Sequence, residues 1–95
     1  MSKVVESTVS VSQVDKNVLK DAINLLLNQE NAVLSNSDTY VVWGKKNKTK
    51  GTLVFLRGLG YADIYIENGQ LKVNADEMYK SEILNMLKQK YVAAY

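Results

Sequence analysis

The feature that most constrains the fold is a run of alternating apolar and polar residues on both sides of Asn68-Gly69. The apolar positions are Ala62, Ile64 and Ile66 before that pair and Leu71, Val73 and Ala75 after it. A period of two is typical of strands with one buried face, and Asn-Gly readily adopts the positive φ angles of a type I′ turn. We therefore predict an antiparallel hairpin whose outward row is Tyr61, Asp63, Tyr65 and Glu67.

The remaining elements follow from the same kind of periodicity. Residues 5–11 alternate like a strand, whereas residues 14–29 carry apolar side chains at helical spacing after Ser12 and Asp15, which suit a helix start. The Asn- and Ser-rich segment 31–38 is typical of a loop. Residues 40–43 and 52–56 are rich in β-branched and aromatic side chains, so we expect two strands joined by a Gly-bounded loop at 44–51. Asp76 is the expected cap of a final helix, and residues 91–95 suit either helix or strand.

These elements predict a single α+β domain spanning residues 1–95. The order is β-α-β-β-β-β-α, and the expected architecture has two layers, with an antiparallel sheet of about five strands and both helices on one face. The apolar residues of the first helix occupy an arc of about 220°, which is wider than one sheet face covers.

Composition excludes several kinds of chemistry. The chain has no cysteine and no histidine, so disulfides, thiol catalysis and histidine-dependent triads are ruled out. Gly58-Leu59-Gly60 lacks the third glycine and the following helix of a dinucleotide-binding motif. We expect no enzyme activity, no cofactor and no metal site.

The sequence also indicates where the protein works. The first residues contain no apolar stretch of signal-peptide length, and the longest apolar runs are far shorter than the roughly 20 residues of a membrane span. We expect a cytoplasmic protein without a membrane partner.

Positive charge is concentrated in one segment. Residues 44–60 hold five basic residues and no acidic one, so this segment carries +5 in a chain of net charge +2. We identify a candidate nucleic-acid surface in the basic residues Lys45, Lys46, Lys48, Lys50 and Arg57 together with Trp43. The alternative is a loop whose lysines serve solubility.

One small domain has difficulty burying all of its apolar residues, and we therefore predict a homodimer. The candidate partner surface consists of Ile23, Leu27, Tyr40, Tyr61 and Tyr65. The alternative for the tyrosines is cross-strand packing within the sheet. The leading function is a non-catalytic binding protein whose partner the sequence leaves open, and nucleic-acid binding is the alternative.

The second half of the chain contains a distinctive set of residues in the predicted hairpin and final helix: Asp63, Ile64, Asn68, Gly69, Leu71, Val73, Ala75 and Asp76, followed by Leu87, Gln89 and Tyr91. In these residues the chain resembles a family of plastid and cyanobacterial proteins, the hypothetical chloroplast reading frame thirty-five family. The resemblance implies the same arrangement of strands and final helix. Because the family has no established activity, the resemblance implies no catalytic residue.

Overall fold

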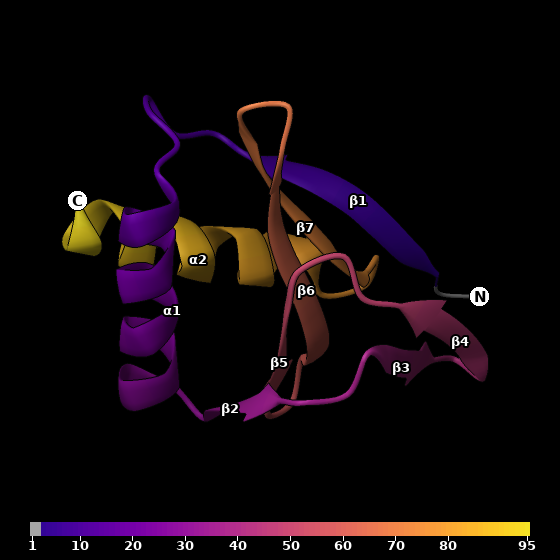
Figure 1. Cartoon of the computed structure of the whole chain (residues 1–95). Coiled ribbons are helices and arrows are strands. Elements are labelled where there is room, and N and C mark those ends of the chain that lie inside the picture. Colours follow the sequence, from indigo (N-terminus) through magenta and orange to yellow (C-terminus); the bar gives the residue numbers. More distant parts are fainter. Residues whose placement is uncertain (1–2) are drawn as a thin grey trace.

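A computed structural model describes residues 3–95 and contains seven strands and two helices over that range (Figure 1). The elements in chain order are β1 (Val4–Val9), α1 (Lys16–Gln29), β2 (Ala32–Ser35), β3 (Thr39–Val42), β4 (Lys45–Lys48), β5 (Thr52–Leu56), β6 (Gly60–Glu67), β7 (Gln70–Asp76) and α2 (Lys80–Ala94).

The main sheet has five antiparallel strands in the order β1-β7-β6-β5-β2. The predicted hairpin at its centre is confirmed. Glu67 pairs with Gln70, and Asn68 and Gly69 have φ angles of 54° and 74°. Asn and Gly adopt this left-handed conformation at low cost, so the local sequence sets the register of β6 and β7.

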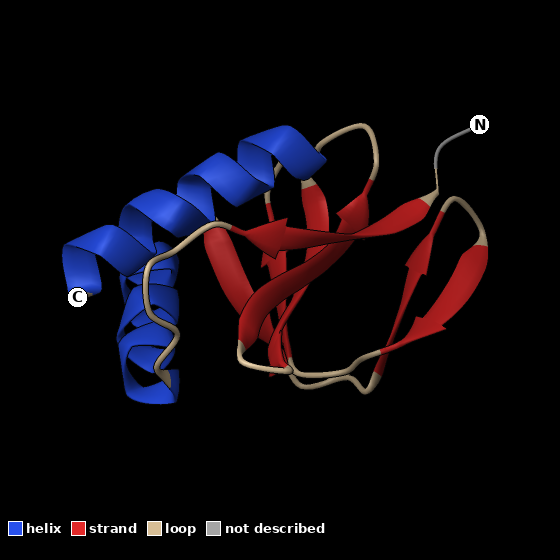
Figure 2. Ribbon diagram, turned by 90° about the horizontal axis from the view of Figure 1, so that it is seen from above, coloured by secondary structure: helices blue, strands red, loops and turns tan. Residues whose placement is uncertain are grey.

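Both helices pack on one face of this sheet (Figure 2). The shared core contains buried side chains of α1, α2 and the sheet: Val9, Leu19, Ala22, Ile23, Leu26, Val54, Leu56, Ala62, Ile64, Leu71, Val73, Ala75, Ile83, Leu87 and Tyr91. The α+β architecture with two helices on one face of a five-stranded antiparallel sheet is therefore confirmed.

The segment predicted as a loop at 44–51 instead contains β4, which pairs with β3 in a separate two-stranded sheet. Trp43 and Gly44 form the turn between them, with φ angles of 52° and 78°. A two-residue turn with two positive φ angles brings the chain straight back, so β3 pairs with the lysine-rich segment rather than with β5. The polar composition of β4 is not typical of a strand, and for that reason the strand was not predicted. β propensity depends strongly on tertiary context.

The segment predicted as a loop at 31–38 contains β2, which fills the place in the sheet that we had assigned to residues 40–43. Val33 pairs with Phe55, and Leu34 pairs with Val54. Three apolar residues flanked by Asn and Ser gave too short a pattern to separate a strand from a loop.

The helix ends agree with prediction at one helix and differ at the other. Asp15 caps α1 and accepts hydrogen bonds from the amides of Asn17 and Val18. Asp76 does not cap α2, which begins at Lys80; its carboxylate instead accepts from the amide of Met78 and from the indole of Trp43. At the C-terminal end, α2 continues to Ala94.

Across the described chain, neither helix has the length and apolar character needed to cross a membrane.

Tyr91 ties α2 to the segment that leads into α1. Its buried hydroxyl accepts a hydrogen bond from the Asp15 amide at 2.8 Å and donates one to the Gln13 carbonyl at 2.7 Å. A Tyr91→Phe variant would leave both backbone groups without this partner, so we expect a loss of about 1–3 kcal/mol in the free energy of unfolding, measured by urea denaturation.

Tyr95→Phe is the matched control. Tyr95 is exposed and its hydroxyl contacts the Gln13 side chain. Loss of this hydroxyl should therefore change the free energy of unfolding by less than about 0.5 kcal/mol. Equal effects of the two substitutions would contradict the role given to the Tyr91 hydroxyl.

Candidate functional site

Part of the second face of the sheet is covered by the chain itself, through hairpin β3–β4 and the link from β4 to β5 (Figure 2). Tyr40 of β3 is buried, with its ring centroid 5.8 Å from that of Tyr61 on β6. The Trp43 indole donates a hydrogen bond of 2.7 Å to the Asp76 carboxylate at the end of β7. The hairpin is therefore attached to the sheet at both its first strand and its turn.

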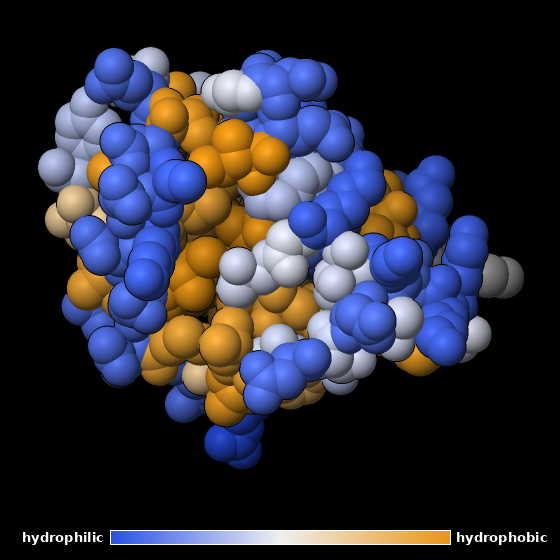
Figure 3. Space-filling model, viewed as in Figure 1, coloured by the Kyte–Doolittle hydropathy of each residue, from blue (hydrophilic) through white to orange (hydrophobic). Residues whose placement is uncertain are grey.

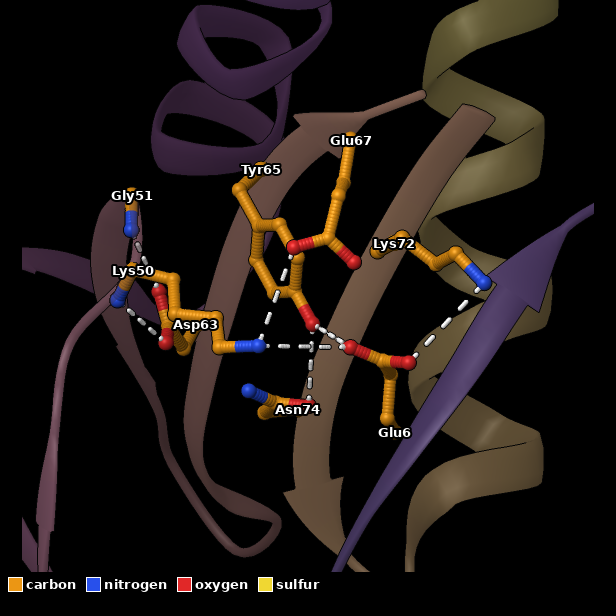
Figure 4. A network of polar contacts seen from close by, with 8 residues as sticks. All are labelled: Glu6, Lys50, Gly51, Asp63, Tyr65, Glu67, Lys72 and Asn74. Atoms are coloured by element: carbon orange, nitrogen blue, oxygen red, sulfur yellow. Dashed lines mark hydrogen bonds and ion pairs between the residues drawn. The ribbon is translucent and has the colours of Figure 1, made fainter. Parts of the chain in front are cut away.

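Asp63 holds the link between the hairpin and the sheet. It points from β6 toward the second face, is fully buried, and accepts hydrogen bonds from the amides of Lys50 at 2.8 Å and Gly51 at 3.0 Å (Figure 4). Buried charge is tolerated when hydrogen-bond donors satisfy it. The prediction that Asp63 faces solvent was wrong, because the chain covers this part of the sheet.

Gly51 permits this close approach. A Cβ atom at this position would lie 2.4 Å from the Ile64 carbonyl oxygen and 2.6 Å from the Tyr65 Cβ. No side chain fits in that space unless β6 moves. The link can therefore lie directly on β6, with its amides within reach of Asp63.

A polar network surrounds Tyr65 on the same face (Figure 4). Its hydroxyl donates to the Glu6 carboxylate and lies 3.3 Å from Asn74 Oδ1. Lys50 Nζ lies 5.3 Å from the centroid of the Tyr65 ring and forms ion pairs with Glu6 at 3.7 Å and Glu67 at 3.8 Å.

The contacts of this network, and the burial of Tyr40 nearby, move three pKa values away from neutral pH. The hydrogen bond from Tyr65, with help from Lys72 and Lys50, keeps the pKa of Glu6 below its ordinary value of 4.5. Burial, followed by the contact with Glu6, raises the pKa of Tyr65 above its ordinary value of 10. Burial, and then the charge of Asp63, raises the pKa of Tyr40 to about 12. Each of these groups is therefore held in its usual charge state at pH 7.

The candidate basic residues do not form one surface. Lys45, Lys46 and Lys48 are exposed on β4, and Trp43 is 60% exposed at the hairpin turn. Lys50 is instead engaged by Glu6 and Glu67. Arg57 lies beyond the end of β5 and lines a shallow hollow with residues of the β2 edge, including Val33.

Most of the candidate partner residues pack inside the monomer. Ile23, Tyr40 and Tyr65 are buried. Tyr61 is partly buried between Tyr40 and Phe55, with ring centroids 5.8 Å and 5.1 Å away. Leu27 is also partly buried and lines a groove beside α1. The alternative of cross-strand aromatic packing applies to Tyr61, which packs against Phe55 of the neighbouring strand β5, whereas Tyr40 packs on Tyr61 from the separate hairpin.

The sequence analysis missed exposed apolar side chains at the edge strand β2. Val33 is 62% exposed and lies opposite Phe55, which is 39% exposed, on the second face of the sheet. Leu34 lies opposite Val54 on the face that carries the helices and is 52% exposed. The short apolar run Ala32-Val33-Leu34 is the sequence signal that could have predicted this edge strand. Among residues 3–95, no cluster of three or more acidic side chains has the arrangement that a metal ion would need.

Comparisons with protein-family models, with curated proteins and with solved structures find no match. The resemblance described above therefore stays a prediction from its residues.

An Asp63→Asn variant tests the attachment of the hairpin. The amide side chain keeps one acceptor oxygen and turns an NH₂ group toward a backbone N–H, so we expect the free energy of unfolding to fall by about 2–3 kcal/mol. Chemical denaturation measures this loss. Asp38→Asn removes a charge from an exposed residue just before β3 and should change stability by less than about 0.5 kcal/mol. Similar stability of both variants would show that Asp63 is not the anchor.

Proposed function

We propose that this chain is a non-catalytic binding protein that holds nucleic acid against hairpin β3–β4. The observation that carries the proposal is a hairpin attached to the sheet, with exposed lysines on β4 and an exposed tryptophan at its turn. Thr39 pairs with Lys48 and Val41 with Lys46, and these residues form the face opposite the buried Tyr40. Lys45 lies beside the turn and is also exposed.

The charge on these lysines is available to a ligand. Lys45, Lys46 and Lys48 take no part in the ion pairs formed within residues 3–95, which use Lys50, Lys72 and Lys90. Lysine side chains neutralise phosphates and release counterions without reading the base sequence. Binding with little sequence preference is therefore expected.

The attachment of the hairpin also favours binding. The contacts of Asp63 with the link and of Asp76 with Trp43 fix the hairpin before a ligand arrives. Less conformational entropy is then lost on association. A two-stranded ribbon is narrow enough to enter the major groove of DNA, and the exposed part of Trp43 offers a surface on which an unpaired base can stack.

The contribution of the β4 lysines is tested by replacing Lys45, Lys46 and Lys48 together with Gln. The unmodified protein should bind a labelled DNA strand or duplex at about 50 mM salt. The logarithm of its binding constant should fall with the logarithm of salt concentration at a slope of about −2 to −3. The triple variant should lose this binding in fluorescence anisotropy.

A matched control changes the same amount of charge elsewhere. Replacing Lys16, Lys20 and Lys88 on the helices with Gln should leave the binding constant within about threefold, because contacts rather than net charge dominate. Absence of binding by the unmodified protein at low salt would end the proposal, as would equal losses in the two triple variants.

A homodimer joined along β2 is the second candidate. Edge strands with exposed apolar side chains and no charged residue readily pair with another strand, and β2 has the sequence Ala-Val-Leu-Ser with Val33 and Leu34 exposed. The opposite edge strand, β1, carries Glu6 at its centre and contacts α2. Pairing of β2 with its copy would continue the sheet across the dimer.

A Val33→Lys variant tests this interface. Light scattering should give the unmodified protein a mass of twice 10.7 kDa and the variant a mass of 10.7 kDa, because a lysine on an edge strand opposes pairing. Val92→Lys, at a similarly exposed valine on α2, should remain dimeric. A mass of 10.7 kDa for the unmodified protein at all concentrations would rule the dimer out.

A further inference from the structure

An apolar groove runs between α1 and the strands β5 and β6 (Figure 3). Its volume is about 490 Å³, which is in the range of small-molecule sites rather than of large protein interfaces. The apolar side chains that line it come from three parts of the fold: Leu19, Ile23 and Leu27 of α1, Leu34 of β2, and Ile64 and Ile66 of β6.

Two lysines at one end of the groove have charge available for a ligand. Lys16 and Lys20 lie in the first half of α1, line the groove and are exposed. Neither takes part in the ion pairs formed within residues 3–95. A third lysine, Lys50, also lines the groove, but Glu6 and Glu67 compensate its charge.

The groove therefore has a cationic end and an apolar end. Leu27 lies 11 residues after Lys16 on α1, so these two positions are separated by about 16 Å along the helix axis. Leu34 of β2, which follows α1 in the chain, lines the groove together with Leu27. Figure 1 shows β2 at the C-terminal end of α1, away from the end that holds Lys16 and Lys20.

We propose that this groove binds a long-chain carboxylate. The carboxylate lies between the ammonium groups of Lys16 and Lys20, and the alkyl chain lies along the apolar floor toward Leu27 and Leu34. The ligand then buries apolar surface while its charge meets two lysines and stays accessible to water. This site is separate from hairpin β3–β4 and does not depend on nucleic-acid binding.

Calorimetric titration of the full chain with dodecanoate, below its micelle concentration, tests the proposal. Dodecanoate should bind saturably with one molecule per chain, and acetate, which has the charge without the tail, should not bind. Dodecan-1-ol, which has the tail without the charge, should bind roughly five- to thirtyfold more weakly. Absence of saturable dodecanoate binding, or equal affinity for the alcohol, would overturn the proposal.

Two variants locate the site. The double variant Lys16→Gln with Lys20→Gln should weaken dodecanoate binding by roughly five- to thirtyfold, while Lys45→Gln with Lys46→Gln, the same change on β4, should leave it unaltered. Leu27→Asp should abolish binding, with the helical circular dichroism signal confirming that the variant folds. Equal affinity in the two double variants would show that the ligand does not lie in this groove.

Discussion

The buried carboxylate of Asp63 is the interaction on which the second face of the sheet depends. Its two oxygens accept the amides of Lys50 and Gly51, and a buried charge left without such donors would be costly. The lack of a side chain at Gly51 makes this geometry accessible. One acidic residue thus holds the chain where it leaves hairpin β3–β4 and enters β5. Lys46 and Lys48 of β4 lie on the opposite side of the hairpin from the buried Tyr40.

The parts of the fold that were predictable from the sequence depend on neighbouring residues. The turn at Asn68-Gly69 and the cap at Asp15 are local interactions, and the apolar periodicity of α1 and β6 is visible within a few residues. By contrast, β2 becomes a strand through a distant partner, with Phe55 opposite Val33. The polar segment β4 becomes a strand because the turn at Trp43-Gly44 returns it onto β3, with Lys46 opposite Val41. Asp76 has the position expected of a helix cap, but its carboxylate bonds the indole of Trp43, 33 residues away. No local pattern indicates such a contact.

The same distinction applies to the candidate sites. Alternation correctly placed Asp63 and Tyr65 on the face away from the helices, but it cannot show whether another segment covers that face. Hairpin β3–β4 and the link to β5 cover Asp63 and Tyr65. Tyrosines that were expected to contact a partner therefore make contacts within the chain. The lysines of β4 remained exposed, whereas Lys50 bonds acidic side chains of β1 and β6. The groove beside α1 joins residues of α1, β2, β5 and β6, and for that reason it was not predictable from any single motif.

The position of β1 in the sheet has a consequence for how the protein is made. Its pairing partner is β7, with Val4 opposite Asp76, so β1 leaves the ribosome well before the strand with which it pairs. Until β7 emerges, the backbone of β1 lacks its partner strand, and until α2 follows, the apolar side of α1 lacks its contacts with α2. Such long-range pairing slows folding and exposes apolar surface in the meantime. The sheet can therefore be completed only after β7 has left the ribosome.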